Sequence, residues 1–205
     1  MTTGAKKHTY WILSLLLIGL STIAWGQDAP RTIQNFILKD ATGQTIELNS
    51  YRDKQAIVVI FTSSNCSWAN NYEERISSLH TQFMGRNVAF IGINSNDASV
   101  SQRDQASQMR SYSPFDFPYL KDSLQEVARQ FGATKNPEVF VLKPINGTFT
   151  VAYQGRIDDN PLDPNMVQQP YLVQALEALL NGKTPATRQT RPQGCSIRWS
   201  DTVNR

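Results

Sequence analysis

Runs of apolar residues separated by polar turns divide the chain into alternating strand and helix candidates. Ala56–Phe61 has no polar member and is rich in β-branched residues, which is the pattern of a strand buried on both faces. Residues 88–93 repeat that pattern. Between these two runs, apolar residues recur at helical spacing and predict an amphipathic helix over residues 67–84. Strand, helix and strand in this order predict a parallel pair at the centre of a sheet.

Two hairpins are predicted around this unit. Apolar runs at residues 35–39 and 45–49 flank an Asp/Gly turn and predict an N-terminal β-hairpin. Residues 138–142 form another buried run, and the alternating residues 149–153 follow it after the turn signal Asn146-Gly147. Because hairpin strands are antiparallel, the closing hairpin makes the predicted sheet mixed.

Three further helices are predicted. Residues 98–112 are polar with weak periodicity and predict an exposed helix. Residues 123–131 predict a helix that Ser123 caps and that places Leu124 on its apolar face. Tyr171–Leu180 is a last amphipathic stretch, which the sequence Asn-Gly then ends.

The expected fold is therefore α/β, with a mixed central sheet flanked by helices on both faces, an N-terminal β-hairpin and an irregular C-terminal tail. We expect a signal peptide over residues 1–26, one domain over residues 27–183, and a tail over residues 184–205 that carries Cys195.

The N-terminal segment has the three parts of a secretory signal peptide. Lys6 and Lys7 precede the apolar residues 10–24, and small residues follow before Gln27. The apolar core is short for a membrane-spanning helix, so cleavage is favoured over an uncleaved anchor. We therefore expect an exported protein, periplasmic or extracellular, with no stable membrane insertion after cleavage and in a compartment where disulfides persist.

The net charge of the chain bears on which partners it can bind. The segment carries two lysines and no acids, so its removal lowers the net charge from +3 to +1. This near-neutral balance, without a Lys/Arg cluster, argues against a nucleic-acid partner.

The chain has two cysteines, Cys66 and Cys195. Cys66 stands where the first buried strand gives way to the predicted helix, so free N–H groups and the helix dipole would favour its thiolate. We expect Ser63 and Asn65 to cap this helix or to donate to the sulfur. The competing interpretation is an inert, buried cysteine.

No metal or cofactor is expected. Cys66, Cys195 and His80 are too few, and their spacing fits no zinc or copper site.

The chain resembles the thioredoxin fold, and more narrowly the redoxins of the alkyl hydroperoxide reductase and thiol-specific antioxidant class. The stretch from Phe61 to Cys66 and Asn136-Pro137-Glu138 carry the wider resemblance. Three motifs carry the narrower one, within a resemblance that covers most of residues 33–199: Ile93-Asn-Ser-Asn-Asp97, Gly155-Arg-Ile-Asp-Asp159 and Gly194-Cys-Ser-Ile-Arg-Trp199. This resemblance implies a thiol-disulfide oxidoreductase or thiol peroxidase, acting on thiol, disulfide or peroxide substrates with an external reductant.

The resemblance also assigns residues. Cys66 matches the attacking cysteine, and Pro137 matches a proline that takes the cis form and faces it. The chain departs from the family pattern on both sides of Cys66. Ala69 stands where thioredoxins carry their second cysteine, and Ser63 where related redoxins carry one. Val59 replaces the proline of the peroxidase motif.

A single cysteine at the attacking position needs a second thiol to complete a turnover. Cys195 is the only candidate within the chain, and an external thiol is the other candidate. Three interpretations remain open: a resolving thiol, a static disulfide that ties down the tail, or two cysteines that never meet. The alternative to an enzyme is a non-catalytic thioredoxin-fold domain used for stability or for binding a partner.

Overall fold

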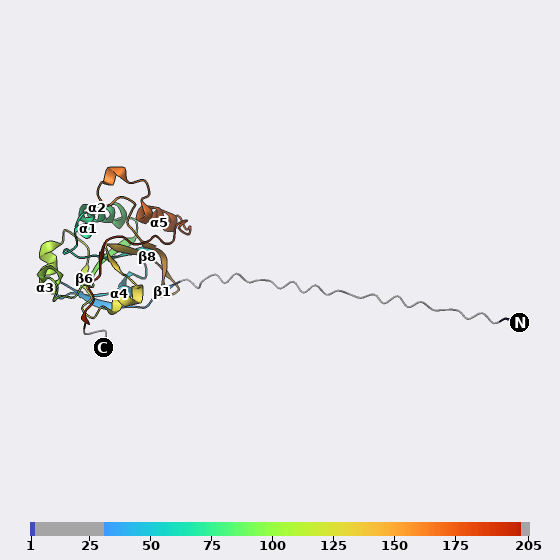
Figure 1. The fold of residues 1–205 in the computed structure, drawn as a ribbon, viewed down its shortest axis with the longest axis horizontal. Helices are drawn as coiled ribbons and strands as arrows, with labels where there is room; N and C mark the ends of the chain where they lie inside the picture. Colours follow the sequence, from blue (N-terminus) through green and yellow to red (C-terminus); the bar gives the residue numbers. More distant parts are fainter. Residues whose placement is uncertain (3–30, 202–205) are drawn as a thin grey trace.

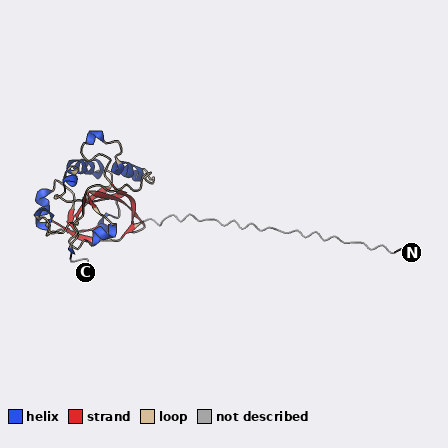
Figure 2. Ribbon diagram, in the orientation of Figure 1, coloured by secondary structure: helices blue, strands red, loops and turns tan. Residues whose placement is uncertain are grey.

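The computed structural model describes residues 1–2 and 31–201 (Figure 1), so most of the predicted signal peptide lies outside the described residues. Eight strands form one mixed, curled sheet (Figure 2). Their order across the sheet is β1 (Thr32–Ile33), β9 (Thr148–Gly155), β8 (Glu138–Ile145), β4 (Ala56–Phe61), β5 (Val88–Asn94), β6 (Tyr119–Lys121), β2 (Ile37–Asp40) and β3 (Thr45–Glu47). A separate pair of strands consists of β7 (Lys135–Asn136) and β10 (Cys195–Ser196).

Strand β4 lies at the centre of the sheet, as its apolar run predicts. All six of its residues are buried. It runs parallel to β5, with Ala56 opposite Val88, and antiparallel to β8, with Phe61 opposite Glu138. Both predicted hairpins are confirmed, because β2 pairs with β3 and β8 pairs with β9 in antiparallel register.

Helices cover both faces of the sheet, as predicted (Figure 1). On one face, α2 (Glu73–Met84) and α5 (Tyr171–Leu180) pack on the inward side chains of β4, such as Val58 and Ile60. On the other face, α4 (Glu126–Phe131) contributes Phe131, whose ring packs edge-on against Phe61 with centroids 5.3 Å apart. Strand β4 is thus packed between two hydrophobic cores, one on each face of the sheet. The loop that leads to Cys66 follows its last residue, Phe61.

The single helix predicted over residues 67–84 is wrong. The structure has a one-turn helix α1 (Ser67–Asn70) and, after a break, α2. Adjacent asparagines at the break are poor helix formers, and the N–H of Tyr72 bonds to Ala69 O at 2.9 Å in a tighter turn. A helix of one turn has a small dipole, so α1 favours a thiolate at Cys66 less than the predicted helix would.

The exposed helix predicted over residues 98–112 is also wrong. Three short turns replace it, the 3₁₀ turn at Gln102–Asp104, α3 (Ala106–Met109) and the 3₁₀ turn at Arg110–Tyr112. Asp104 and Met109 are fully buried. Ser63, in the loop after β4, and Asn94, at the end of β5, bind the Asp104 carboxylate and hold it inward. The weak apolar periodicity of this segment gives no sign of these contacts.

The predicted start of the helix after β6 is wrong in detail. Gln125 has a positive φ of 58°, and α4 begins after it at Glu126. Asp122, rather than Ser123, accepts hydrogen bonds from the first turn, including one from Ala128 N at 2.9 Å. Leu124 is 66 % exposed instead of lying on the apolar face.

The tail crosses the domain in contact with it along its described length. Gln154 of β9 bonds through its main chain to Arg188 and Thr190 at 3.0 Å each. Further along, β10 pairs with β7, and Ile197 is buried in the same core as Phe131. The segment is irregular, as predicted, but it is held in a fixed position.

Candidate redox site

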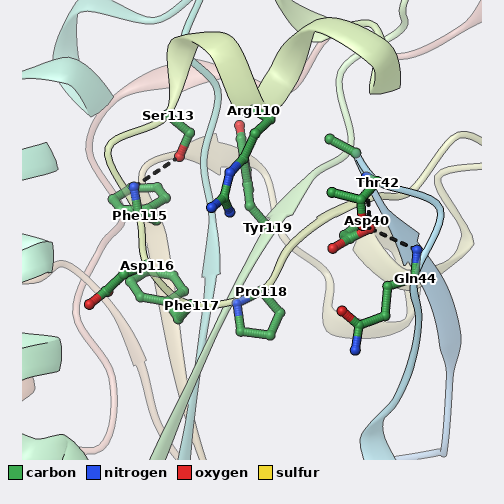
Figure 3. Close-up of a pocket in the computed structure, with 11 residues that line it drawn as sticks. Asp40, Thr42, Gln44, Arg110, Ser113, Phe115, Asp116, Phe117, Pro118 and Tyr119 are labelled. Carbon is green, nitrogen blue, oxygen red and sulfur yellow. Dashed lines mark hydrogen bonds between the residues drawn. The ribbon is translucent and has the colours of Figure 1, made fainter.

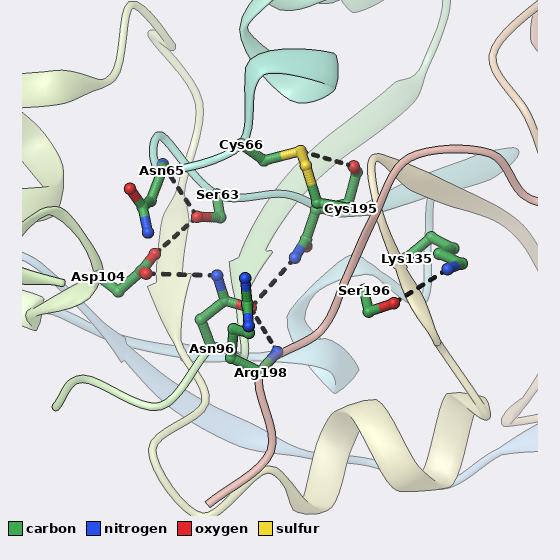
Figure 4. Close-up of a disulfide and its surroundings, with 10 residues drawn as sticks. Ser63, Asn65, Cys66, Asn96, Asp104, Lys135, Cys195, Ser196 and Arg198 are labelled. Atoms are coloured by element: carbon green, nitrogen blue, oxygen red, sulfur yellow. Dashed lines mark hydrogen bonds between the residues drawn. A yellow bond between two sulfur atoms is a disulfide. The ribbon is translucent and has the colours of Figure 1, made fainter. Parts of the chain in front are cut away.

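The two cysteines form a disulfide (Figure 4). Cys66 follows β4 and is the N-cap residue of α1, whereas Cys195 opens β10 on the tail, 129 positions away. Cys66 is 1 % exposed and Cys195 is only partly buried. Of the three arrangements that the sequence left open, the structure excludes the one in which the cysteines never meet.

The cis-proline loop lies against this disulfide. The Asn136–Pro137 peptide bond is cis, the form that the family resemblance implies. Cys66 Sγ lies 3.1 Å from the main-chain oxygen of Asn136, and Asn136 is the residue directly opposite Cys195 in the β7–β10 pair. Asn136 therefore contacts or faces both sulfur-bearing residues.

Gly194 allows the tail to approach this loop. It has a φ of +154°, and a Cβ atom at this position would lie 2.2 Å from Asn136 O. A side chain of any size would push the tail away from the loop, because the contact is with main chain that cannot rotate aside. The glycine before Cys195 is thus a condition for the disulfide geometry.

The tail is held mainly through its backbone. Ile197 N donates to Thr134 O at 3.0 Å, and Arg198 N donates to Asn96 Oδ1 at 3.0 Å. The Gln125 side chain donates to Arg198 O at 2.8 Å. Since these contacts involve main-chain atoms of the tail, they do not depend on its side chains.

Glu138 supports the cis-proline loop from inside. It is 3 % exposed and follows Pro137 directly. Its carboxylate accepts hydrogen bonds from the N–H groups of Thr134 and Lys135 at 2.8 and 3.1 Å, which fixes the strand that the tail pairs with. Burial raises the pKa of the Glu138 carboxyl, and these hydrogen bonds offset part of the rise.

This pKa shift predicts a pH dependence of stability. A raised carboxyl pKa means that the folded protein binds the proton more tightly than the unfolded chain does. The stabilisation is therefore complete below the ordinary pKa of 4.5 and is lost as pH rises through the raised value. Glu138→Gln keeps an acceptor oxygen and removes the titration. We expect it to reduce the fall in unfolding free energy that the wild type shows as pH rises above 4.5, measured by urea unfolding. An unchanged profile in the variant would contradict this assignment.

The capping role predicted for Ser63 and Asn65 is wrong. No side chain caps α1. Ser63 Oγ instead donates to Asp104 at 2.6 Å and accepts from Asn65 N at 3.0 Å, and the Asn65 side chain is exposed. In this oxidised structure neither side chain is shown bonding to Cys66 sulfur.

Four residues near the disulfide were missed as site residues, namely Asn94, Asn96, Asp104 and Asn136. All four are buried. The run of polar residues after a buried strand, at positions 94–97, was the one available signal. Nothing local in the sequence points to Asp104, since its partners are distant along the chain.

A small hollow beside Pro137 includes Trp68, Arg156 and Gln193 of the tail. Asp158 lies behind it, buried, where it accepts from Tyr72 Oη at 2.8 Å and pairs with Arg75. Asp158 is therefore part of the support for this side of the site, and its partners leave it little freedom.

A second pocket lies apart from the disulfide, between the turn of the first hairpin and residues 110–119 (Figure 3). Arg110 projects toward it, and Tyr119 on its wall donates to Thr62 O at 3.3 Å. None of the residues that line it carries sulfur.

The described residues contain neither a side-chain cluster suited to a metal ion nor a membrane-spanning helix. Over residues 31–201, no cluster of three or more histidine, cysteine or acidic side chains is arranged to bind a metal ion. Within the same part of the chain, no helix has the length and apolarity needed to cross a bilayer.

The sheet order, the cis-proline loop and a cysteine at the start of the helix after the central strand define a thioredoxin-fold protein with a disulfide at the position of the redox centre. The chain belongs to the AhpC/TSA family, whose model matches residues 26–160.

Individual relatives agree with this placement. The chain is 25 % identical over 148 residues to the thiol-disulfide oxidoreductase ResA of Bacillus subtilis, covering 69 % of this chain and 78 % of that protein. Among solved structures, a hypothetical protein from Sinorhizobium meliloti is 30 % identical, with a TM-score of 0.75 over 84 % of this chain and 94 % of the other. A conserved protein from Geobacillus kaustophilus is 28 % identical, with a TM-score of 0.75 over 84 % and 92 % of the two chains.

Proposed function

We propose that the protein is an exported thiol-disulfide oxidoreductase that cycles Cys66 and Cys195 between a disulfide and two thiols. The observation that carries this proposal is the disulfide itself, which joins the cysteine at the attacking position to a cysteine on the tail, beside a cis-proline loop. Cys195 thereby takes the part of the local second cysteine that Ala69 replaces.

Reduction of the disulfide begins at the more accessible sulfur. A thiolate of an external dithiol attacks Cys195, the S–S bond breaks, and Cys66 leaves as a thiolate. The second thiol of the reductant then attacks the mixed disulfide and releases Cys195. The reductant becomes a disulfide, and the protein has gained two electrons and two protons.

The reduced protein then passes these electrons to a substrate. Without the covalent link, only non-covalent contacts hold the tail, so it can open and uncover Cys66. The Cys66 thiolate attacks a substrate disulfide, and one substrate sulfur leaves as a thiolate. Cys195 then attacks Cys66 in the mixed disulfide, which releases the second substrate thiol and restores the Cys66–Cys195 bond.

Acceptors for both thiol hydrogens support this cycle. Cys66 Sγ is 3.1 Å from Asn136 O, which can accept from the reduced thiol. The Asn136 side chain faces Cys195 across the strand pair, and its buried Oδ1 has no hydrogen-bond partner among the described residues. Reduction would supply that oxygen with a donor.

The tail also supports a polypeptide as the substrate class. Its strand β10 pairs with β7 as an extended segment held by main-chain hydrogen bonds. An open tail would leave the same strand edge free for an extended segment of another protein. Export, as predicted for residues 1–26, would put such a partner in the periplasm or outside the cell, where protein disulfides persist.

Two assays test the proposal. With dithiothreitol as reductant, the protein should accelerate the reduction of insulin disulfides. In a parallel assay hydrogen peroxide replaces insulin, and a faster reaction there would make the protein a thiol peroxidase instead. If neither substrate reacts faster than without protein, the oxidoreductase proposal is wrong.

A static disulfide is the second candidate. The observations that favour it are the burial of Cys66 and the continuous main-chain contacts of the tail. In that case the disulfide would serve stability alone, and it would resist reductants as long as the domain stays folded.

A further inference from the structure

The buried carboxylate of Asp104 is linked by hydrogen bonds to the loop that carries Cys66 and, through Asn96, to the tail that carries Cys195. Asp104 is fully buried on the 3₁₀ turn after β5. One of its oxygens accepts from Ser63 Oγ at 2.6 Å and from Asn94 Nδ2 at 2.8 Å, and the other accepts from Asn96 Nδ2 at 3.3 Å (Figure 4).

These contacts connect Asp104 to each side of the disulfide. Ser63 belongs to the loop before Cys66, and its main-chain oxygen accepts from Cys66 N at 3.0 Å. Asn96 Oδ1 accepts from Asn136 Nδ2 at 3.2 Å and from Arg198 N at 3.0 Å. Asn96 therefore joins the cis-proline loop and the tail, and Asp104 holds Asn96.

The carboxylate fixes the direction of this chain of hydrogen bonds. Both oxygens of Asp104 accept hydrogen bonds, so the Asn96 amide turns its nitrogen toward Asp104. Its oxygen then has to point the other way, toward the two donors on Asn136 and Arg198. With the amide reversed, its nitrogen would face the two donors on Asn136 and Arg198, and its oxygen would face the accepting carboxylate of Asp104.

We propose that Asp104 is a positioning residue for the redox pair. It acts through Asn96, whose oriented oxygen holds Asn136 and the tail so that Cys195 stays against Cys66. The consequence for catalysis rests on the proposed function, but the positioning of the tail does not.

Asp104→Asn is the direct test. If its new amide keeps the bonds from Ser63 and Asn94, its nitrogen faces the Asn96 nitrogen. Asn96 must then reverse, and Arg198 N and Asn136 lose their acceptor. We expect the equilibrium constant for disulfide formation in glutathione buffers, read by alkylation and mass spectrometry, to fall about tenfold. Amide hydrogen exchange at Arg198 in the oxidised protein should rise by a similar factor.

Two variants accompany this test. Asp122→Asn is the matched control, because Asp122 is also buried and accepts from Ser95 Oγ and Ala128 N, but its carboxylate makes no bond to the cis-proline loop or to the described part of the tail. Asn96→Ala removes the acceptor itself and should give the effect expected of Asp104→Asn. It also serves as the test if the Asp104 variant does not fold.

The outcomes separate the two proposals. Faster hydrogen exchange at Arg198 in the Asp104 and Asn96 variants, with no change in Asp122→Asn, supports the positioning role. A disulfide that glutathione never opens would count against the proposed function and would leave this result for the positioning role intact. If all three variants match the wild type, or if Asp122→Asn shifts both readouts as much as Asp104→Asn, Asp104 has no special role at the redox pair.

Discussion

Cys66→Ser is expected to abolish insulin reduction, and reduced Cys195→Ser, freed of dithiothreitol, is expected to stop after one round. The reason is that Cys66 makes the attacking bond, whereas Cys195 breaks the mixed disulfide that follows. Without dithiothreitol, Cys195→Ser should therefore accumulate a covalent adduct with the substrate at Cys66, which intact-protein mass spectrometry will detect. With dithiothreitol, turnover of Cys66→Ser should fall to the rate of the reaction without protein, and Cys195→Ser should turn over only as fast as dithiothreitol resolves the adduct.

The two variants control for each other. Both lose the same disulfide and should lose the same stability, so a difference between them reports on chemistry alone. If Cys66→Ser retains turnover, or if the adduct forms on Cys195 in that variant but not on Cys66 in the other, the assignment of the attacking cysteine is reversed.

Reduction of the disulfide is expected to lower the unfolding free energy by about 5 kcal/mol in the chain-entropy model. The bond closes a loop of 129 positions, so breaking it releases much conformational freedom in the unfolded chain. Urea unfolding with and without dithiothreitol measures the difference. The double variant Cys66→Ser/Cys195→Ser should match the reduced wild type and be indifferent to reductant.

The reduced domain should nevertheless remain folded. Both helix-covered cores form within residues 33–180, and the described part of the tail adds only Ile197 to them. An unfolded reduced protein would mean that the disulfide is indispensable to the fold, which would favour the static interpretation over a redox cycle.

The elements that the sequence predicted correctly are those in which a local pattern and burial agree. Ala56–Phe61 and Tyr171–Leu180 were predicted with the bounds that the structure has, because one is uniformly apolar and the other is amphipathic at helical spacing. Asn146-Gly147 correctly predicted a hairpin, because its turn needs two residues that accept a positive φ.

Two of the three errors in the helices have a common cause, which is a buried polar side chain that binds partners outside its own turn. The turns around Asp104 depend on Ser63 and Asn94, and the start of α4 depends on Asp122. Hydrophobic periodicity cannot report such contacts, because it assumes that polar residues face solvent.

The sequence identified both cysteines of the candidate site, but it did not show whether they form a disulfide. Chain position alone left Cys195 free to be a resolving thiol, a static partner or an unrelated residue. The structure adds the strand pairing at Asn136, the close approach that Gly194 permits, and the hydrogen bonds that run from Asp104 through Asn96 to the tail.

The central claim is that the Cys66–Cys195 disulfide opens in the folded protein, and thiol labelling tests it most directly. The protein is incubated with mild dithiothreitol, alkylated without denaturant and analysed by mass spectrometry, while near-UV circular dichroism monitors the fold. We predict that both Cys66 and Cys195 are labelled while the fold persists, and that an oxidant added before alkylation prevents the labelling. If neither is labelled until the protein is unfolded, the disulfide is a structural staple and the redox cycle is wrong.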